Sequence, residues 1–99
     1  ESLQKVLATR SRFTADLDSR GWFTYPTQAN FVFTEPIDAT RAKGPEIAAS
    51  VFRFLKEQKI LVRYFPNHPL TESFLRVTIG TDSEMETLNR AIDQWMANV

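Results

Sequence analysis

Two arginines occupy matching places in two strand-like segments, and this pattern indicates a site for an acidic ligand. Arg63 lies in the apolar segment 60–65, and Arg76 lies in the apolar segment 74–79. Neighbouring side chains of a strand point to opposite faces of its sheet. Because burying an unpaired arginine under helices carries a large desolvation cost, we expect both guanidiniums on the uncovered face. There they would form a fork that suits a carboxylate or a phosphate.

The same face is expected to carry apolar side chains. Strand alternation puts Phe65 and Phe74 beside the arginines, with Leu61 as a further candidate. Arginine on the solvent side of a sheet is also ordinary solubilising chemistry, and this simpler interpretation stays open. However, an uncovered face with several aromatic residues usually has something lying on it.

The other reactive side chains do not form a catalytic pattern. His68 is the only histidine and lies in a loop between prolines, without an acid at a catalytic or ligand spacing, so we expect it to be exposed. Asp82, Glu84 and Glu86 are typical of a helix start, where the dipole favours negative charge. The absence of cysteine excludes disulfides and thiolate metal sites. We therefore predict no catalytic, cofactor or metal site within this chain.

Helices and strands that could position the two arginines alternate along the chain. The predicted elements are a helix that ends at Arg20–Gly21, a strand at 30–34, a helix that opens at Gly44-Pro45-Glu46, strands at 60–65 and 74–79, and a helix whose capping box is Thr81 with Glu84. Residues 22–26 are interpreted as an extended segment and turn. The last helix shows the clearest apolar stripe, formed by Met85, Leu88, Ile92, Trp95, Met96 and Val99.

This order of elements predicts an α+β fold. The strand-helix-strand unit is expected to place its two strands parallel, with the third strand antiparallel and between them. The result would be a two-layer sandwich with a small mixed sheet and helices on one face. A chain of 99 residues has the size of a single domain, here 1–99.

The amino-acid composition argues against some classes of binding partner. Twelve basic and twelve acidic residues balance, which argues against a dedicated nucleic-acid binder. No apolar run reaches the length of a membrane span, and the first residues lack the pattern of a signal peptide. We therefore expect a cytoplasmic protein with no nucleic-acid or membrane partner.

Three segments carry a family resemblance. Residues 25–32 (YPTQANFV), 60–65 (ILVRYF) and 75–81 (LRVTIGT), the last followed by Glu84, resemble segments of histidinol-phosphate aminotransferases in the same order. The resemblance implies the small carboxy-terminal domain of a fold-type I, pyridoxal-phosphate-dependent aminotransferase. It also implies a cytoplasmic homodimer that acts in histidine biosynthesis as a histidinol-phosphate:2-oxoglutarate transaminase.

The resemblance also implies roles for the two arginines. The residue matching Arg76 binds the acidic group of a phosphorylated or carboxylated amine, and the residue matching Arg63 helps to hold the phosphate. The lysine that binds the cofactor covalently belongs to the large domain, which is absent, and none of Lys5, Lys43, Lys56 and Lys59 has a matching context. The isolated domain is therefore expected to bind no pyridoxal phosphate and to be inactive.

One position departs from the family pattern. Lys59 stands where the family usually has the glycine that ends a helix. Either Lys59 adopts a left-handed conformation at a modest cost, or the helix ends differently.

Two other functional classes are alternatives to an aminotransferase domain. The segment 29–33 resembles the aromatic strand of an RNA-recognition motif, but the glycine of that signature is missing and the net charge is zero. A stand-alone interaction or regulatory module with an anion-binding sheet face is the remaining alternative.

Overall fold

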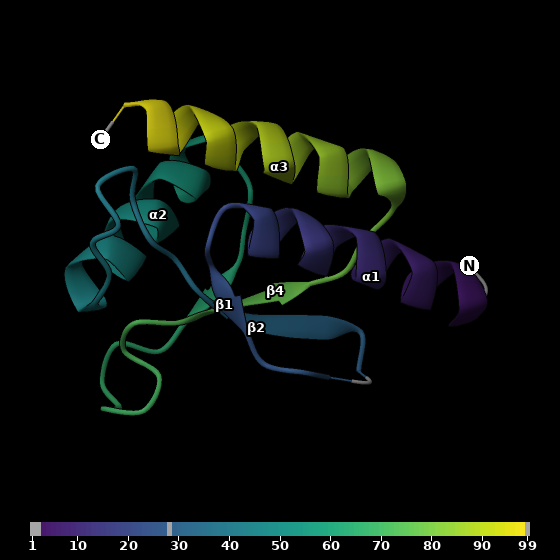
Figure 1. The fold of residues 1–99 in the computed structure, drawn as a ribbon, viewed down its shortest axis with the longest axis horizontal. Helices are drawn as coiled ribbons and strands as arrows, with labels where there is room; N and C mark the ends of the chain where they lie inside the picture. The colour runs from purple at the N-terminus through teal and green to yellow at the C-terminus, as the bar shows by residue number, and fades with distance from the viewer. Residues whose placement is uncertain (1–2, 28, 99) are drawn as a thin grey trace.

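Residues 3–27 and 29–98, the part of the chain that the computed structural model describes, form three helices and a four-stranded sheet. The helices are α1 (Leu3–Ser19), α2 (Pro45–Glu57) and α3 (Asp82–Ala97), and the strands are β1 (Phe23–Thr24), β2 (Phe31–Glu35), β3 (Arg63–Tyr64) and β4 (Leu75–Thr78). Figure 1 shows α1 and α3 together on one side of the sheet. The predicted two-layer α+β architecture is therefore confirmed.

Strand β4 lies between two other strands of the sheet. The strand order is β1-β2-β4-β3, and β4 is antiparallel to both β2 and β3. The predicted position of β4 between the two others is confirmed. The expectation of a mixed sheet is wrong. Strands β2 and β3 run in the same direction, but β4 lies between them, so each hydrogen-bonded pair of described strands is antiparallel.

Two strands differ from their predicted extent. Residues 22–26, interpreted as an extended segment and turn, contain β1, in which Phe23 pairs with Glu35 and Thr24 with Thr34 of β2. With two residues it is too short to show an alternating pattern. The predicted strand 60–65 is reduced to β3, because the backbone N–H of Ile60 donates instead to the Leu55 carbonyl at 2.8 Å and completes the end of α2.

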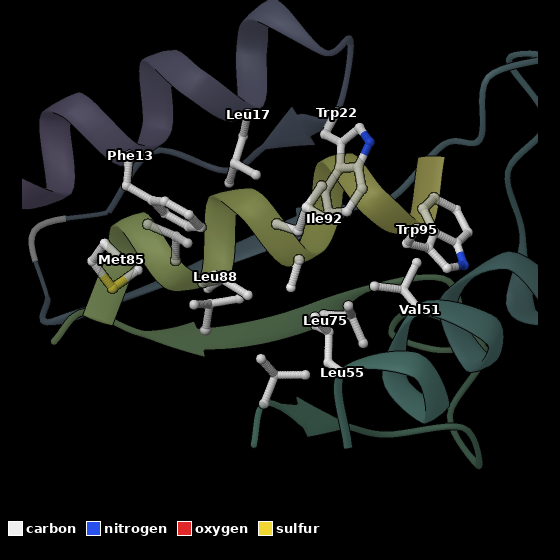
Figure 2. Close-up of a cluster of buried hydrophobic side chains, with 14 of the residues drawn as sticks. Phe13, Leu17, Trp22, Val51, Leu55, Leu75, Met85, Leu88, Ile92 and Trp95 are labelled. Atoms are coloured by element: carbon white, nitrogen blue, oxygen red, sulfur yellow. The ribbon is translucent and has the colours of Figure 1, made fainter. Parts of the chain in front are cut away.

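The core fills the space between the helices and one face of the sheet. Trp22 and Trp95 meet edge to face with 6.2 Å between ring centroids, and each indole nitrogen donates a hydrogen bond, to the Ile37 carbonyl and the Ser50 hydroxyl respectively. Figure 2 shows side chains from all three helices around Leu75 of β4. The predicted stripe of α3 is confirmed for its core residues Met85, Leu88, Ile92 and Trp95, with Met96 packed beside them, and Val99 lies outside the described residues.

Local signals at the helix ends explain where each helix stops or starts. The Thr81 hydroxyl accepts a hydrogen bond from the Glu84 N–H at 3.1 Å, and the Glu84 carboxylate accepts one from the Thr81 N–H at 2.8 Å, so the predicted capping box is present. Gly21 ends α1 with φ of 86°. Lys59 ends α2 with φ of 64°, and it completes a Schellman turn in which its N–H donates to the Lys56 carbonyl. The left-handed alternative for Lys59 is therefore confirmed.

Asp82 joins the start of α3 to α1. Its carboxylate accepts hydrogen bonds from the Thr9 hydroxyl at 2.7 Å and from the Arg12 guanidinium at 2.6 Å. These bonds, above all the one from Thr9, lower the pKa of Asp82 below its ordinary value. Asp82 and Glu84 thus have structural roles at the start of α3, as predicted. In the described part of the chain, no helix is long and apolar enough to cross a membrane.

Lys59→Gly should stabilise the chain. Glycine adopts positive φ without the steric cost that a Cβ imposes, so we expect the free energy of unfolding to rise by about 1 kcal/mol. Urea unfolding measures the change, and Lys59→Ala is the matched control, because it removes the charge but keeps the Cβ. If alanine stabilised as much as glycine, the backbone conformation would not be the cause.

Asp82→Asn should make stability less dependent on pH. Because folding lowers the pKa of Asp82, its ionised form stabilises the folded chain above the unfolded-state pKa, and this contribution is lost as pH falls through the folded-state pKa. Urea unfolding between about pH 7 and about pH 2 should show a wild-type advantage that disappears on acidification. Glu86→Gln, at an exposed position of the same helix, is the control. A gap between wild type and Asp82→Asn that stayed constant across this range would contradict the assignment.

Candidate functional site

The two arginines lie directly opposite each other in the sheet. Arg63 of β3 and Arg76 of β4 are Cα partners, and the adjacent pair, Tyr64 and Leu75, lies on the core face. Arg63 is exposed and Arg76 is half-buried. The prediction that both side chains emerge on the uncovered face is confirmed, because strand alternation turns them away from Leu75.

Aromatic rings surround the Arg76 guanidinium. Its central carbon lies 5.2 Å from the centroid of the Phe31 ring and 5.6 Å from that of Phe65. The Phe65 ring also lies 5.9 Å from the guanidinium carbon of Arg63. All three contacts have the geometry of cation–π interactions, which hold a guanidinium without using its N–H donors.

Arg76 has unsatisfied hydrogen-bonding capacity. Its Nε is buried and has no hydrogen-bond partner among the described residues. Within residues 3–27 and 29–98, the salt bridges involve Arg12, Arg20 and Lys43, and neither Arg63 nor Arg76 has a carboxylate partner. A buried donor without a partner is costly in a folded protein and calls for an explanation, such as a ligand or an ordered water.

A hollow of about 530 Å³ opens beside Arg76 on this face. Its described lining is mostly aromatic and hydroxyl-bearing, and it consists of Tyr25, Pro26, Thr27, Phe31, Phe33, Phe65, His68, Thr71 and Arg76. Arg76 supplies the only permanent positive charge among these residues. An apolar hollow with one convergent charged group is a typical small-molecule site, in which the charged group fixes the orientation of the ligand.

The wall of the hollow rests on a stack of rings. Phe74 lies against Phe33 with 5.3 Å between centroids and against Tyr25 with 5.4 Å. Phe74 is therefore on the predicted face but buried in this stack, away from the two guanidiniums. Leu61 is 80% exposed and borders a different hollow beside the start of α3, so it does not back the arginine pair.

Sequence reasoning missed several residues of the site. Phe31 and Phe33 alternate with the buried Val32 and Thr34, so the alternation of β2 was a signal for their common face. Tyr25 carried no such signal, because β1 is so short. Trp22 is buried in the core, whereas Tyr25 is half exposed at the hollow.

His68 lies at the rim of the hollow. It is exposed, as predicted, and its Nδ1 accepts a hydrogen bond from the Leu70 N–H at 3.1 Å. No group of three or more potential metal ligands occurs in the described part of the chain. The geometry of the hollow therefore supports binding of an acidic group by Arg76.

Comparison with known proteins shows a consistent family likeness. The model of the family "Aminotransferase class I and II" matches residues 1–92. Among similar proteins are the histidinol-phosphate aminotransferases of Microcystis aeruginosa, 39% identical over 94% of this chain, and of Synechocystis, 43% identical over 90%. The chain spans about a quarter of the length of these relatives, 24% and 23% respectively.

Solved structures show the same fold. A histidinol-phosphate aminotransferase from Sinorhizobium meliloti, solved in complex with pyridoxal-5'-phosphate, superposes with a TM-score of 0.79 at 21% identity, over 96% of this chain and 24% of that one. The enzyme of the same name from Clostridium acetobutylicum gives 0.78 at 22% identity, over 97% and 28%. At these identities the likeness concerns the fold.

Arg76→Met should stabilise the chain. The change removes one of two like charges that face each other across the strand pair, while methionine keeps contact with the neighbouring rings. We expect the free energy of unfolding to rise by about 1 kcal/mol. Urea unfolding measures it, with Arg53→Met at an exposed position of α2 as control. A variant less stable than the wild type would show that Arg76 is a stabilising residue.

Proposed function

This chain belongs to the aminotransferase class I and II family, and we propose that it is the small carboxy-terminal domain of a larger pyridoxal-phosphate-dependent enzyme. The large cofactor-binding domain is then its partner within the same polypeptide. The enzyme transfers the amino group of histidinol phosphate to 2-oxoglutarate in histidine biosynthesis. Support comes from the similar proteins, which are histidinol-phosphate aminotransferases, and from the quarter of their length that this chain spans.

We propose that the role of this chain is to bind the acidic group of the substrate. One observation carries the proposal: the half-buried Arg76 lies between two aromatic rings at an apolar hollow, with its Nε unpartnered among the described residues. Such a guanidinium can offer two parallel N–H donors to a phosphate or a carboxylate. Arg63, across the strand pair, adds a second positive charge, which suits a doubly charged phosphate ester.

The cofactor fits poorly within this chain alone. None of its lysines lines the hollow, and Lys43 lies 3.9 Å from Glu35 in an ion pair. Pyridoxal phosphate would supply the electron sink for amino-group transfer from its site in the large domain. The residues of this chain would orient the substrate by its acidic end and keep water from its apolar part.

The same proposal extends to assembly and location. We assign the complete enzyme to the cytoplasm as a homodimer, in line with the resemblance to histidinol-phosphate aminotransferases. The RNA-binding alternative is less well supported, because the net charge of the chain is zero and Phe33 and Phe74 on this face stack on each other.

Arg76→Ala in the complete enzyme should lower kcat/KM for histidinol phosphate by about 100-fold or more, because a charge-assisted hydrogen-bond pair is lost. The loss should be much smaller for histidinol, which lacks the phosphate. Arg76→Lys should recover only part of the activity, because an ammonium group cannot make the bidentate contact. Arg63→Ala should weaken binding of the phosphorylated substrate to a lesser degree.

Steady-state transamination assays with both substrates check these outcomes. Arg53→Ala, an exposed arginine of α2 away from the hollow, is the matched control. If Arg76→Ala kept the wild-type preference for the phosphorylated substrate, the role of Arg76 would be wrong. If the wild type preferred a carboxylated amine, the substrate would be wrong while the role of Arg76 stood.

A further inference from the structure

The ring of Phe65 is shared by both arginines of the site. It lies 5.9 Å from the guanidinium carbon of Arg63 and 5.6 Å from that of Arg76. We propose that Phe65 is a positioning residue, which holds the two guanidiniums ready for a single acidic group. This inference rests on the proposed anion-binding function and assigns Phe65, which lines the hollow, a role that it exerts through the two arginines.

The need for such a residue follows from the charges. Arg63 and Arg76 are direct partners across an antiparallel strand pair, and like charges in this position repel each other. No carboxylate of the described residues pairs with either guanidinium. Long side chains under repulsion would otherwise spread into solvent, and the two charges would separate.

An aromatic face can hold two repelling guanidiniums close together and, unlike a carboxylate, leave their N–H donors free. The negative face of the ring attracts a cation, but it leaves the N–H donors of the guanidinium free. A carboxylate at the same place would occupy those donors and compete with the ligand. Phe65 therefore orients both arginines and preserves their capacity to bind an anion.

Phe65 is better placed for this role than its neighbours. It follows β3 two residues after Arg63, so strand alternation directs both side chains to the same face. Phe31 lies over Arg76 alone, from β2 on the other side of β4. Among the described rings, Phe65 is the one that contacts both cations.

Phe65→Leu keeps an apolar side chain of similar size but removes the aromatic face. In the complete enzyme, we expect KM for histidinol phosphate and the inhibition constant of inorganic phosphate to rise by about 5- to 10-fold, with kcat within about twofold of wild type. Phe65→Tyr keeps the face and should restore both constants. Phe52→Leu is the matched control, because it removes a ring that packs at a tilted angle against Tyr64 on the opposite side of the sheet.

The outcomes separate this inference from the proposed function. If Arg76→Ala abolished phosphate inhibition while Phe65→Leu and Phe65→Tyr both matched the wild type, the function would stand and the role of Phe65 would be overturned. If Phe65→Leu impaired kcat and KM equally and tyrosine failed to rescue it, Phe65 would be structural only. If phosphate inhibited wild type and Arg76→Ala equally, the anion site itself would be wrong, and the inference with it.

Discussion

The antiparallel pairing of β4 with β3 is the constraint on which the rest of the site depends. The register sets Arg63 against Arg76, and the alternation of both strands turns these two side chains to one face while Leu75 turns to the other. A slip of either strand by one residue would turn the arginine of that strand under the helices and turn its core side chains to the open face. The hydrophobic core therefore keeps the charged pair where a ligand can reach it.

The two faces of the sheet make opposite contributions to stability. The covered face is closely packed by side chains such as Leu75 and Trp95, and its tryptophan N–H groups are hydrogen-bonded. The uncovered face holds facing like charges and a buried guanidinium nitrogen without a partner among the described residues. Unfavourable features of this kind gather at functional sites, where the rest of the structure must offset them. The aromatic rings reduce the cost without occupying the donors.

Local patterns predicted most of the fold, because each depends on residues close together in the chain. The capping box of Thr81 and Glu84, the stripe of α3 and the helix end at Gly21 are of this kind. Strand β1 could not be predicted, because its pairing with β2 is what defines it. The shortening of β3 could not be predicted either, because it follows from the Schellman turn at Lys59. Much of the hollow was missed for a related reason: Tyr25 and Phe31 come from segments that meet Arg76 only in the folded chain.

The sequence by itself determined the order of the three helices and three of the strands, the family, and the common face of Arg63 and Arg76, because periodicity and motif spacing are local properties. The tertiary structure alone decided that β1 pairs with β2, that Phe65 lies over both guanidiniums, and that Leu61 turns away from them. These facts depend on the distances between side chains far apart in sequence. Such distances are set by packing across the whole core, and no single segment carries that information.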